Sequence, residues 1–451
     1  ISRLTCEMQE GLVVVEGSPR LGWVMESPEN GTRQSAYEID IREAFTGRSV
    51  WNSGKVYSSQ SQLVSTKGAD IRPDNSFNYS WRVRVWDETD TPSEWSSEAK
   101  FRAVPERLSS GQWIGAITRQ NAHLPEGRKF HGGELKKPEV KADWEAVDTL
   151  AKKSICLRRT FQVGDATEGG TNRKPGKKIV EATAYVCGLG FYEFSLNGKK
   201  VGNSEFAPLW SDYDKTVYYN TYDVTEQLRR GENVVGILLG NGFYNVQGGR
   251  YRKLQISFGP PTLLFELVIN YEDGTCTTVH SDNDWKYDFS PVTFNCIYGG
   301  EDYDARREQK GWNQIGFDDS HWRPVVIQEA PKGILRPQMA APVKIMERYD
   351  IQKVTKLNAE QVASASVSTK RTVDPSAFVL DMGQNLAGFP EITVRGKRGQ
   401  KVTLIVAEAL TEEGACNQRQ TGRQHYYEYT LKGEGDETWH PRFSYYGFRY
   451  I

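Results

Sequence analysis

The densest group of chemically active side chains is acidic and lies in the segment 297–308 (IYGGEDYDARRE). Glu301, Asp302 and Asp304 stand close together here, and two arginines beginning with Arg306 follow at once. Paired carboxylates can act as the acid and the base that cleave a glycosidic bond. Opposite charges this close in sequence also pair with one another. We therefore expect Glu301, Asp302, Asp304 and Arg306 to have a structural or domain-docking role.

A second polar cluster, Asp318, Asp319, Ser320 and His321, precedes Trp322. Such side chains cap tight turns by accepting hydrogen bonds from nearby backbone N–H groups. Carboxylate and imidazole groups can also bind a metal ion. We favour the capped turn over the metal site.

Aromatic side chains crowd two short parts of the middle of the chain. They are Trp210, Tyr213, Tyr218, Tyr219, Phe243 and Tyr244. Planar rings stack on the C–H faces of sugars, so this crowding suits carbohydrate contact. The alternative is ordinary packing inside a sandwich core.

The balance of charges excludes several kinds of partner. The 451 residues carry 57 basic and 58 acidic side chains, for a formal charge of -1 at pH 7. This balance creates no field that would gather nucleic acid or an anionic membrane. No apolar run approaches the roughly 20 residues that cross a bilayer, and phosphate-loop and Gly-x-Ser-x-Gly motifs are absent. We expect a neutral substrate or partner, no nucleic acid and no membrane insertion.

The cysteines and the first residue bear on the compartment. Six cysteines are spread along the chain without a Cys-x-x-Cys pair, so we expect buried free thiols, with a disulfide as the alternative. The chain begins at Ile1, which suits a processed secretory precursor as well as an edited sequence. The expected localisation is periplasmic or extracellular.

Strand patterns dominate the chain from end to end. Alternate residues from Tyr79 to Val85 form a core face, while Trp86 falls on the arginine side, where it can stack on Arg84. Together with neighbouring alternation, this strand predicts a first β-sandwich over residues 1–104.

The middle of the chain predicts a jelly roll over residues 105–335, with a polar insertion at 119–153. Apolar residues recur at helical spacing late in the insertion, which predicts a short surface helix at 143–153. Asn197-Gly198 and Asp273-Gly274 predict hairpin turns.

Residues 336–451 predict a third sandwich that ends in the stretch 440–451 (HPRFSYYGFRYI). Its aromatics and arginines at strand spacing need a neighbouring strand or domain to cover them. We expect the sequence to be cut here, before a further domain, and we expect Arg449 to take part in docking that domain. The expected fold class is all-β, as three consecutive β-sandwich or jelly-roll domains without long amphipathic helices.

These motifs together resemble one family, the bacterial-type α-L-rhamnosidases. Residues 4–101 look like the fibronectin-III-like domain that leads these enzymes, 154–322 like their galactose-binding-like jelly roll, and 342–451 like their third sandwich. The likeness is carried by PRLGW at 19–23, WNSGKV at 51–56, YSWRVRVWD at 79–87, GLGFYE at 188–193, LNG at 196–198, YDVT at 222–225, LGNGFY at 239–244, DMGQN at 381–385 and PRF at 441–443.

The resemblance implies hydrolysis of terminal α-L-rhamnose from glycans with inversion, by a carboxylic acid that protonates the leaving oxygen and a carboxylate that activates water. In the family both groups belong to an (α/α)6 barrel that follows the third sandwich. We therefore assign no catalytic residue to this chain and expect it to be an inactive accessory portion. Its expected partners are its own barrel and a rhamnose-containing glycan.

Some members of this family bind rhamnose on a jelly-roll module with calcium. If that property carries over, the expected sugar contacts are Trp210, Tyr213, Asn241, Phe243 and Tyr244. No cofactor is required by the implied reaction, and a Ca²⁺ ion at the jelly roll is the one ion that the resemblance admits.

Two other functions agree with the sequence. One is a non-catalytic carbohydrate-binding or adhesion protein, whose natural mass would be near 51 kDa. The other is a different glycosidase that shares the jelly roll, and coding sequence beyond Ile451 would reveal its catalytic fold.

Overall fold

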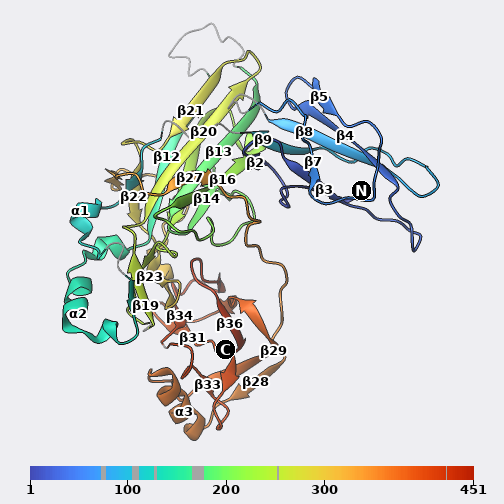
Figure 1. Cartoon of the computed structure of the whole chain (residues 1–451). Coiled ribbons are helices and arrows are strands. Elements are labelled where there is room, and N and C mark those ends of the chain that lie inside the picture. Colours follow the sequence, from blue (N-terminus) through green and yellow to red (C-terminus); the bar gives the residue numbers. More distant parts are fainter. Residues whose placement is uncertain (73–77, 104–110, 126–128, 165–176, 251–252, 423) are drawn as a thin grey trace.

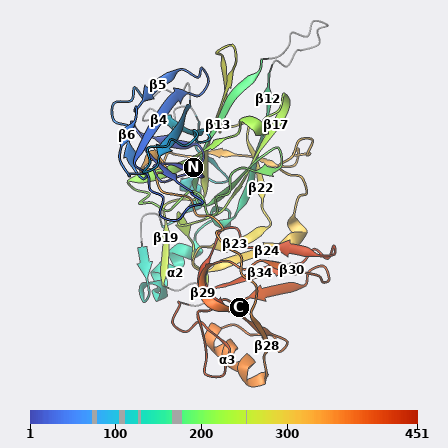
Figure 2. The ribbon, with the colours of Figure 1, turned by 90° about the vertical axis from the view of Figure 1, so that its right-hand side faces the viewer.

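The computed structural model describes the chain except for residues 73–77, 104–110, 126–128, 165–176, 251–252 and 423. Strands hold 42% of the residues and helices 9%, which confirms the all-β expectation. Figure 1 shows a first unit projecting to one side, a jelly roll in the middle and a third unit below it. Figure 2 shows the same stacking of jelly roll and third unit after a quarter turn.

The first unit is a sandwich of two sheets. One sheet consists of β1 (Arg3–Cys6), β3 (Arg20–Val24) and β7 (Val64–Ser65); the other of β2 (Val13–Val15), β9 (Ala99–Ala103), β8 (Tyr79–Trp86), β4 (Ala36–Glu43) and β5 (Ser49–Asn52), with β6 (Val56–Tyr57) beside β4. Trp23 and Phe101 are buried between the sheets. Tyr79, Trp81 and Val83 belong to the same core, which confirms the expected core face of β8.

The opposite face of β8 carries a stack of rings and cations. The Arg84 guanidinium lies 5.0 Å from the ring centre of Trp86 and 4.9 Å from that of Trp95, and Arg82 lies 4.5 Å from Trp95. The expected stacking of Trp86 on Arg84 is confirmed. Cation–π contacts of this kind contribute about 0.5–1 kcal/mol each at exposed sites.

A buried ion pair joins the first unit to the jelly roll. Arg102 Nη1 donates to Glu181 Oε1 at 2.6 Å, and the two side chains expose 0% and 7% of their surface. The same Nη1 donates to Asn78 Oδ1 at 3.1 Å and to Thr183 Oγ1 at 3.2 Å. Burial raises the pKa of the Glu181 carboxyl, against the lowering effect of Arg102. Each charge therefore depends on the other, because neither reaches water.

The jelly roll packs two larger sheets face to face. One follows the order β26 (Val326–Ile327), β10 (Ile114–Gly115), β20 (Thr262–Tyr271), β13 (Ile179–Leu189), β16 (Thr216–Asp223), β27 (Ile334–Pro337), with β21 (Cys276–His280) beside β20. The other follows β15 (Lys199–Lys200), β14 (Tyr192–Leu196), β17 (Gly231–Leu239), β12 (Ile155–Val163), β22 (Lys286–Phe289), β25 (Arg323–Pro324). A one-turn 3-10 helix, η3 (Thr225–Gln227), follows β16. Both predicted hairpin turns are confirmed, since β14 pairs with β15 and β20 with β21.

The insertion folds against the side of the jelly roll. It contains α1 (Arg119–Ala122), β11 (Lys129–His131), η1 (Glu134–Lys136), α2 (Pro138–Glu145) and η2 (Thr149–Lys152), and β11 pairs with β19 (Leu254–Ser257), which pairs with β18 (Asn245–Val246). The predicted helix at 143–153 is wrong in its bounds. Pro138 begins α2 earlier, and the Asp148 carboxylate accepts the Leu150 N–H and begins a separate turn.

The third unit takes strands from both sides of residue 335. Its four-stranded sheet has the order β23 (Val292–Cys296), β24 (Gly300–Asp304), β34 (Tyr426–Thr430), β31 (Lys401–Leu404). Smaller sheets are formed by β28 (Lys353–Lys356), β29 (Phe378–Gly388) and β36 (Tyr446–Tyr450), by β30 (Ile392–Val394) and β35 (Glu437–Trp439), and by β32 (Ala409–Leu410) and β33 (Cys416–Asn417). β24 runs parallel to β34. Gly300, the first residue of β24, has a φ of +94°, and a Cβ there would lie 1.9 Å from the Tyr426 carbonyl oxygen. Only glycine therefore fits at this position.

One helix of the third unit was not expected. α3 (Ala359–Thr369) begins at a capping box, in which the Asn358 side chain accepts the Gln361 N–H and the Gln361 side chain accepts the Asn358 N–H. Asn358 and Gln361 stand three positions apart, which is the sequence signature of such a start. Among the residues that the structure describes, no helix is long and apolar enough to cross a membrane.

The final stretch is covered inside this chain by a neighbouring strand, one of the two kinds of cover that its pattern was expected to need. β36 pairs with β29, and the Tyr450 N–H donates to the Ala407 carbonyl at 2.9 Å on its other side. Phe443 and Phe448 expose 1% and 2% of their surface. The aromatic spacing thus reports a core position within the third unit.

We predict that Arg102→Met lowers the free energy of unfolding of the first unit and its interface by about 3–5 kcal/mol, because Glu181 is left buried without its cation. Guanidinium unfolding followed by tryptophan fluorescence measures the loss. The double variant R102M/E181L should recover part of it. Arg72→Met, which breaks an ion pair with side-chain exposures of 69% and 66%, is the control; a loss as small in R102M as in R72M contradicts the prediction.

Candidate functional site

The acidic cluster lies on β24, and its three carboxylates point to different partners. Successive side chains of a strand face opposite sides of the sheet, so Glu301 and Asp302 diverge. Asp304 ends the strand and caps the 3-10 helix η4 (Ala305–Arg307) by accepting the Arg306 N–H. The three groups therefore form no common site.

Glu301 holds the segment 441–443 of the third unit. Its side chain is fully buried. Oε1 accepts the Arg442 backbone N–H at 2.9 Å, and Oε2 accepts the Phe443 N–H at 2.8 Å. Burial raises the pKa of the Glu301 carboxyl to about 8, although the hydrogen bonds from Arg442 and Phe443 act to lower this pKa. Glu301 on β24 thus ties two parts of the third unit to each other, and a docking role for this residue stays a prediction.

The guanidinium of Arg442 extends the same junction. Its Nη1 lies 3.3 Å from Glu193 Oε1 on β14 and 3.3 Å from His440 Nε2. Burial lowers the pKa of His440, and the Arg442 charge adds to that effect. Polar groups of the jelly roll and of the third unit thus meet in one half-buried cluster.

Asp302 pairs with Arg250, which follows the glycine-rich segment of the jelly roll. The Arg250 guanidinium lies 4.2 Å from the ring centre of Phe294 and 3.7 Å from that of Tyr426. Arg371 lies 4.1 Å from the Tyr426 ring. Arg250 is held in place by stacking between two rings and by its carboxylate partner. Asp302 therefore takes part in the contact between the jelly roll and the third unit.

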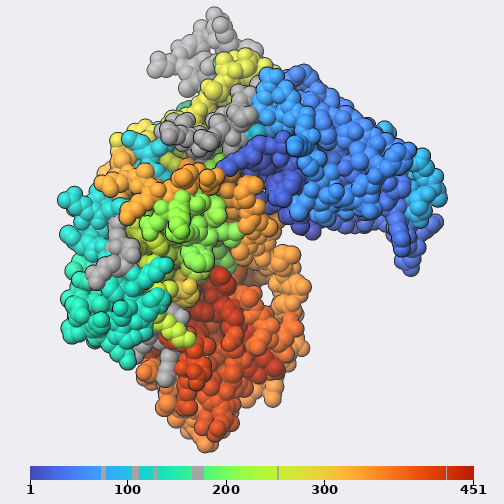
Figure 3. Space-filling model, in the orientation of Figure 1, coloured from blue at the N-terminus to red at the C-terminus, as the bar shows by residue number. Residues whose placement is uncertain are grey.

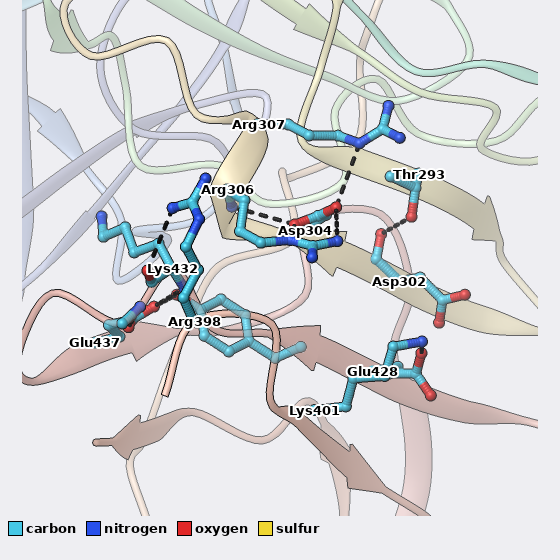
Figure 4. A network of polar contacts seen from close by, with 12 residues as sticks. Thr293, Asp302, Asp304, Arg306, Arg307, Arg398, Lys401, Glu428, Lys432 and Glu437 are labelled. Atoms are coloured by element: carbon cyan, nitrogen blue, oxygen red, sulfur yellow. Dashed lines mark hydrogen bonds and ion pairs between the residues drawn. The ribbon is translucent and has the colours of Figure 1, made fainter. Parts of the chain in front are cut away.

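Asp304 pairs with the two arginines that follow it. Its Oδ1 accepts from Arg306 Nε at 2.8 Å and its Oδ2 lies 3.3 Å from Arg307 Nε. Hydrogen bonding from Arg306 lowers the pKa of the Asp304 carboxyl. Figure 4 shows Asp304 pointing toward both arginines and the Asp302 side chain pointing away from it. The expected pairing of neighbouring opposite charges is confirmed for this residue.

Arg449 lies within the third unit. Its Nε and Nη2 donate to the two carboxylate oxygens of Asp381 at 2.8 and 3.1 Å. This bidentate pair joins β36 to β29. It ties two strands of one unit, and docking by Arg449 onto a further domain stays a prediction.

The second polar cluster is a capped turn, as expected. Asp318 Oδ1 accepts the Ser320 N–H at 3.0 Å. Asp319 pairs with Arg158 and, at 2.7 Å, with Lys286 Nζ. Both carboxylates are therefore engaged by the chain itself.

The predicted sugar contacts divide into two groups. Tyr213, Asn241 and Tyr244 expose 5%, 0% and 1% of their surface, so they cannot reach a sugar at the surface, and this part of the prediction is corrected. Tyr213 and Tyr244 line a hollow of about 50 Å³, far below the roughly 300 Å³ at which small-molecule pockets begin. Trp210 exposes 64% and Phe243 is half-buried.

Asn241 belongs to a buried network of amide groups instead. Its Nδ2 donates to the Lys152 carbonyl at 2.9 Å and to the Asn295 carbonyl at 3.1 Å. Asn245 Nδ2 donates to Asn241 Oδ1 at 2.8 Å and to the Ala151 carbonyl at 2.9 Å. The network ties the glycine-rich loop to the end of the insertion and to β23.

Aromatic rings gather across the boundary between the jelly roll and the third unit, and we call Trp210, Phe243, Tyr298, Phe206 and Tyr445 the aromatic platform. Trp210 and Tyr445 are exposed, Phe243 and Tyr298 are half-buried and Phe206 is buried. The Trp210 and Phe243 ring centres lie 5.8 Å apart, Phe243 and Tyr298 5.9 Å, and Phe206 and Tyr445 5.0 Å. Tyr445 exposes 39% of its surface. Tyr298 and Tyr445 were not among the predicted sugar contacts, because only the fold brings Tyr298 beside Phe243 and Tyr445 beside Phe206.

Phe206 supports the platform with a strained backbone. Its φ is 54°, a region that bulky side chains avoid. Such strain persists only where the surroundings impose it, and it gathers at ligand-binding sites. The Phe206 ring also lies 5.7 Å from Phe389, which links the platform to β29 and its neighbours.

Metal-ligand geometry is not found in the described part of the chain, where no three His, Cys, Asp or Glu side chains lie together as ligands of an ion. The calcium ion at the jelly roll stays a prediction. All six cysteines are free, and all but Cys276 are buried, which confirms the expected free thiols.

We predict that Glu301→Gln costs about 1–3 kcal/mol, because an amide N–H then opposes a backbone N–H in a buried place. The folded pKa near 8 exceeds the unfolded value, so the wild-type carboxyl loses stability as pH rises between about 4.5 and 8. The penalty of E301Q relative to wild type should therefore shrink from pH 5 to pH 8 in urea unfolding experiments.

Glu437→Gln is the matched control for E301Q. Glu437 likewise accepts backbone N–H bonds, three in all, from Lys432 at 2.9 Å, Gly433 at 2.7 Å and Glu434 at 3.4 Å. Burial raises the pKa of this carboxyl, but the hydrogen bonds outweigh burial and the pKa is lowered. Its stabilisation is lost only below about pH 4.5, so the E437Q penalty should stay constant from pH 5 to 8. A penalty of E301Q that grows with pH would contradict the raised pKa.

Three family models match consecutive parts of the chain. Residues 1–104 match the Rha78A-like, N-terminal immunoglobulin domain, residues 177–347 the alpha-L-rhamnosidase N-terminal domain, and residues 371–451 the bacterial alpha-L-rhamnosidase concanavalin-like domain. An immunoglobulin domain and a fibronectin-III domain share the two-sheet architecture seen in the first unit.

Two similar relatives are named α-L-rhamnosidases. One from Formosa agariphila is 34% identical over 97% of this chain and 44% of its own length, and one from Streptomyces avermitilis is 29% identical over 98% and 54%. The chain thus spans about half the length of the curated relatives it matches.

Solved structures agree with these matches. The Streptomyces avermitilis α-L-rhamnosidase complexed with L-rhamnose superposes with a TM-score of 0.75 at 27% identity, over 100% of this chain and 55% of that one. The Aspergillus terreus enzyme gives a TM-score of 0.75 at 27% identity, over 100% and 46%. The three family domains in succession and the shared fold show that this chain belongs to the α-L-rhamnosidase family of glycoside hydrolases.

Proposed function

We propose that this chain is the accessory β-sandwich portion of an α-L-rhamnosidase, which supports a catalytic domain that removes terminal α-L-rhamnose from glycans with inversion. The proposal is supported by three family domains in succession and by relatives about twice as long. Together they favour a scaffold that works with the remaining half of such a protein.

The proposal that this chain is inactive by itself is supported by the acidic cluster, whose carboxylates all have partners within the chain. Inverting hydrolysis needs an acid and a base about 6.5–9.5 Å apart on either side of one sugar. Glu301 has no exposed surface, Asp302 pairs with Arg250, and Asp304 pairs with two arginines. None of these groups can flank a sugar while it keeps these partners.

We expect no release of 4-nitrophenol from 4-nitrophenyl α-L-rhamnopyranoside by the 451-residue chain above the buffer rate. The reason is that its clustered carboxylates serve structure. Absorbance at alkaline quench measures the product, and a full-length relative serves as the positive control. Turnover by this chain that survives further purification would contradict the proposal.

We further propose that the aromatic platform contacts rhamnose-containing glycan. Its support is the exposed face of Trp210 beside Phe243 and Tyr298, since flat rings stack on the apolar faces of sugars. The platform spans the jelly roll and the third unit, so it exists only when the two are docked.

Trp210→Ala should weaken retention by a rhamnose-rich polysaccharide at least about threefold in affinity electrophoresis, because it removes the most exposed ring of the platform. Tyr57→Ala is the matched control, since Tyr57 is an aromatic ring 76% exposed on the first unit. Equal retention of W210A and wild type would remove the platform from glycan contact.

A further inference from the structure

Six large apolar side chains are exposed along one edge of the third unit, and we call them the apolar strip. They are Ile345, Met346, Tyr349, Ile351, Val354 and Phe378. Each of them exposes at least 42% of its surface, and Met346 exposes 84%. Figure 1 shows the chain between the jelly roll and β28 running down the outside of the third unit, and Figure 3 shows the orange surface of this part of the chain at that edge. Exposed apolar patches on soluble proteins mark sites of contact with a partner.

Backbone hydrogen bonds tie down both ends of the segment 344–351, which carries most of the apolar strip. On one side of it the Val343 carbonyl accepts the Glu205 N–H of the jelly roll at 2.8 Å. On the other side the Gln352 N–H donates to the Asp381 carbonyl of β29 at 2.8 Å. The segment forms no helix or strand of its own, yet its position is fixed at both ends. A partner therefore meets a surface that is already ordered, which lowers the entropic cost of binding.

The composition of this segment is that of a protein–protein contact. Lys344, Glu347, Arg348 and Asp350 are interspersed with the apolar residues, and their formal charges cancel. The cores of such contacts are enriched in aromatic residues, methionine and arginine. A segment without net charge has no field that would draw it to an anionic membrane. The apolar strip therefore fits the apolar surface of another folded domain.

The last residue of the chain lies in the same sheet as the strip. The Ile451 N–H donates to the Leu380 carbonyl at 2.9 Å, and the Leu380 N–H donates to the Ile451 carbonyl at 2.7 Å. On its other side Leu380 pairs with Val354 of β28. Residues directly opposite one another in a sheet share a face, so Val354, Leu380 and Ile451 form one row.

This row gives the distance from the chain end to the strip. Neighbouring strands lie about 4.8 Å apart, so Ile451 lies about 10 Å from Val354. Val354, at the outer end of the row, exposes 60% of its surface. Within the described part of the chain, β28 pairs with β29 alone. Polypeptide that continues from Ile451 thus begins beside the strip.

We propose that the apolar strip is the docking surface for the part of the protein that follows Ile451 in the longer molecule. The inference rests on the proposed function, in which a catalytic domain accompanies this portion. Relatives about twice as long as this chain provide for such a domain, and the short path from Ile451 brings its beginning to the strip. A second copy of this chain is the other possible occupant, and the experiments below separate the two.

Hydrogen exchange measured by mass spectrometry, on the 451-residue chain and on the full-length protein, tests the docking surface. The backbone N–H groups of residues 345–351 should exchange at least about tenfold more slowly in the full-length protein, because the docked domain shields them from water. The exposed loop at 28–32 of the first unit is the internal control and should exchange equally in both proteins. Equal exchange of residues 345–351 in the two proteins overturns the proposal.

Met346→Glu in the full-length protein should abolish this protection, because a charge buried in an apolar contact is costly. Met25→Glu is the matched control, since Met25 is an exposed methionine of the first unit, and it should leave the protection intact. In the 451-residue chain M346E should unfold at the wild-type temperature, because the side chain is exposed there. Protection that persists in M346E overturns the proposal. If full-length M346E does not fold, the wild-type comparison decides.

Two further measurements identify the occupant. Light scattering gives the mass of the 451-residue chain in solution, and a dimer that M346E dissociates assigns the strip to a second copy and overturns the proposal. Hydrolysis of 4-nitrophenyl α-L-rhamnopyranoside by the full-length protein separates this inference from the proposed function. An active full-length protein with an unprotected strip overturns the docking surface alone. An inactive one with a protected strip supports the docking surface and contradicts the proposed function.

Discussion

A buried carboxylate, Glu301 on β24, fixes the part of the third unit that contacts the jelly roll. Glu301 accepts the backbone N–H groups of Arg442 and Phe443, and a buried acceptor is costly unless it is used in this way. The same contact brings Phe443 onto Gly240, where a Cβ would lie 2.4 Å from the ring. Parallel pairing of β24 with β34 continues the contact along a shared sheet. The part of the third unit that faces the jelly roll is therefore held by a strand ladder and a buried carboxylate.

The proposed glycan surface depends on these junctions. The aromatic platform combines Trp210 and Phe243 of the jelly roll with Tyr445 of the third unit. Side chains from distant parts of the chain become neighbours only after the units dock. Docking through the Arg250–Asp302 and Arg442–Glu193 pairs on one side and the Arg102–Glu181 pair on the other thus decides which surface side chains become neighbours.

Local patterns predicted the strands well and the helices poorly. The alternation along β8 and the turns at Asn197-Gly198 and Asp273-Gly274 depend only on residues close together in the sequence. The structure therefore contains them as predicted. The helix of the insertion was displaced because Pro138 and the Asp148 cap begin separate turns. The capping box of α3 was readable from Asn358 and Gln361, although its short length hid the amphipathic pattern.

The amino-acid sequence by itself determined the all-β class, the sandwich units and the family, because these follow from periodicity, turn residues and motif order. Only the tertiary structure decided which polar and aromatic residues face a ligand. Asn241 and Tyr244 carry the right chemistry for a sugar yet are buried, and Glu301 carries the right chemistry for catalysis yet accepts backbone hydrogen bonds. Burial and partner choice arise from contacts between residues far apart in the chain, and no local pattern contains them.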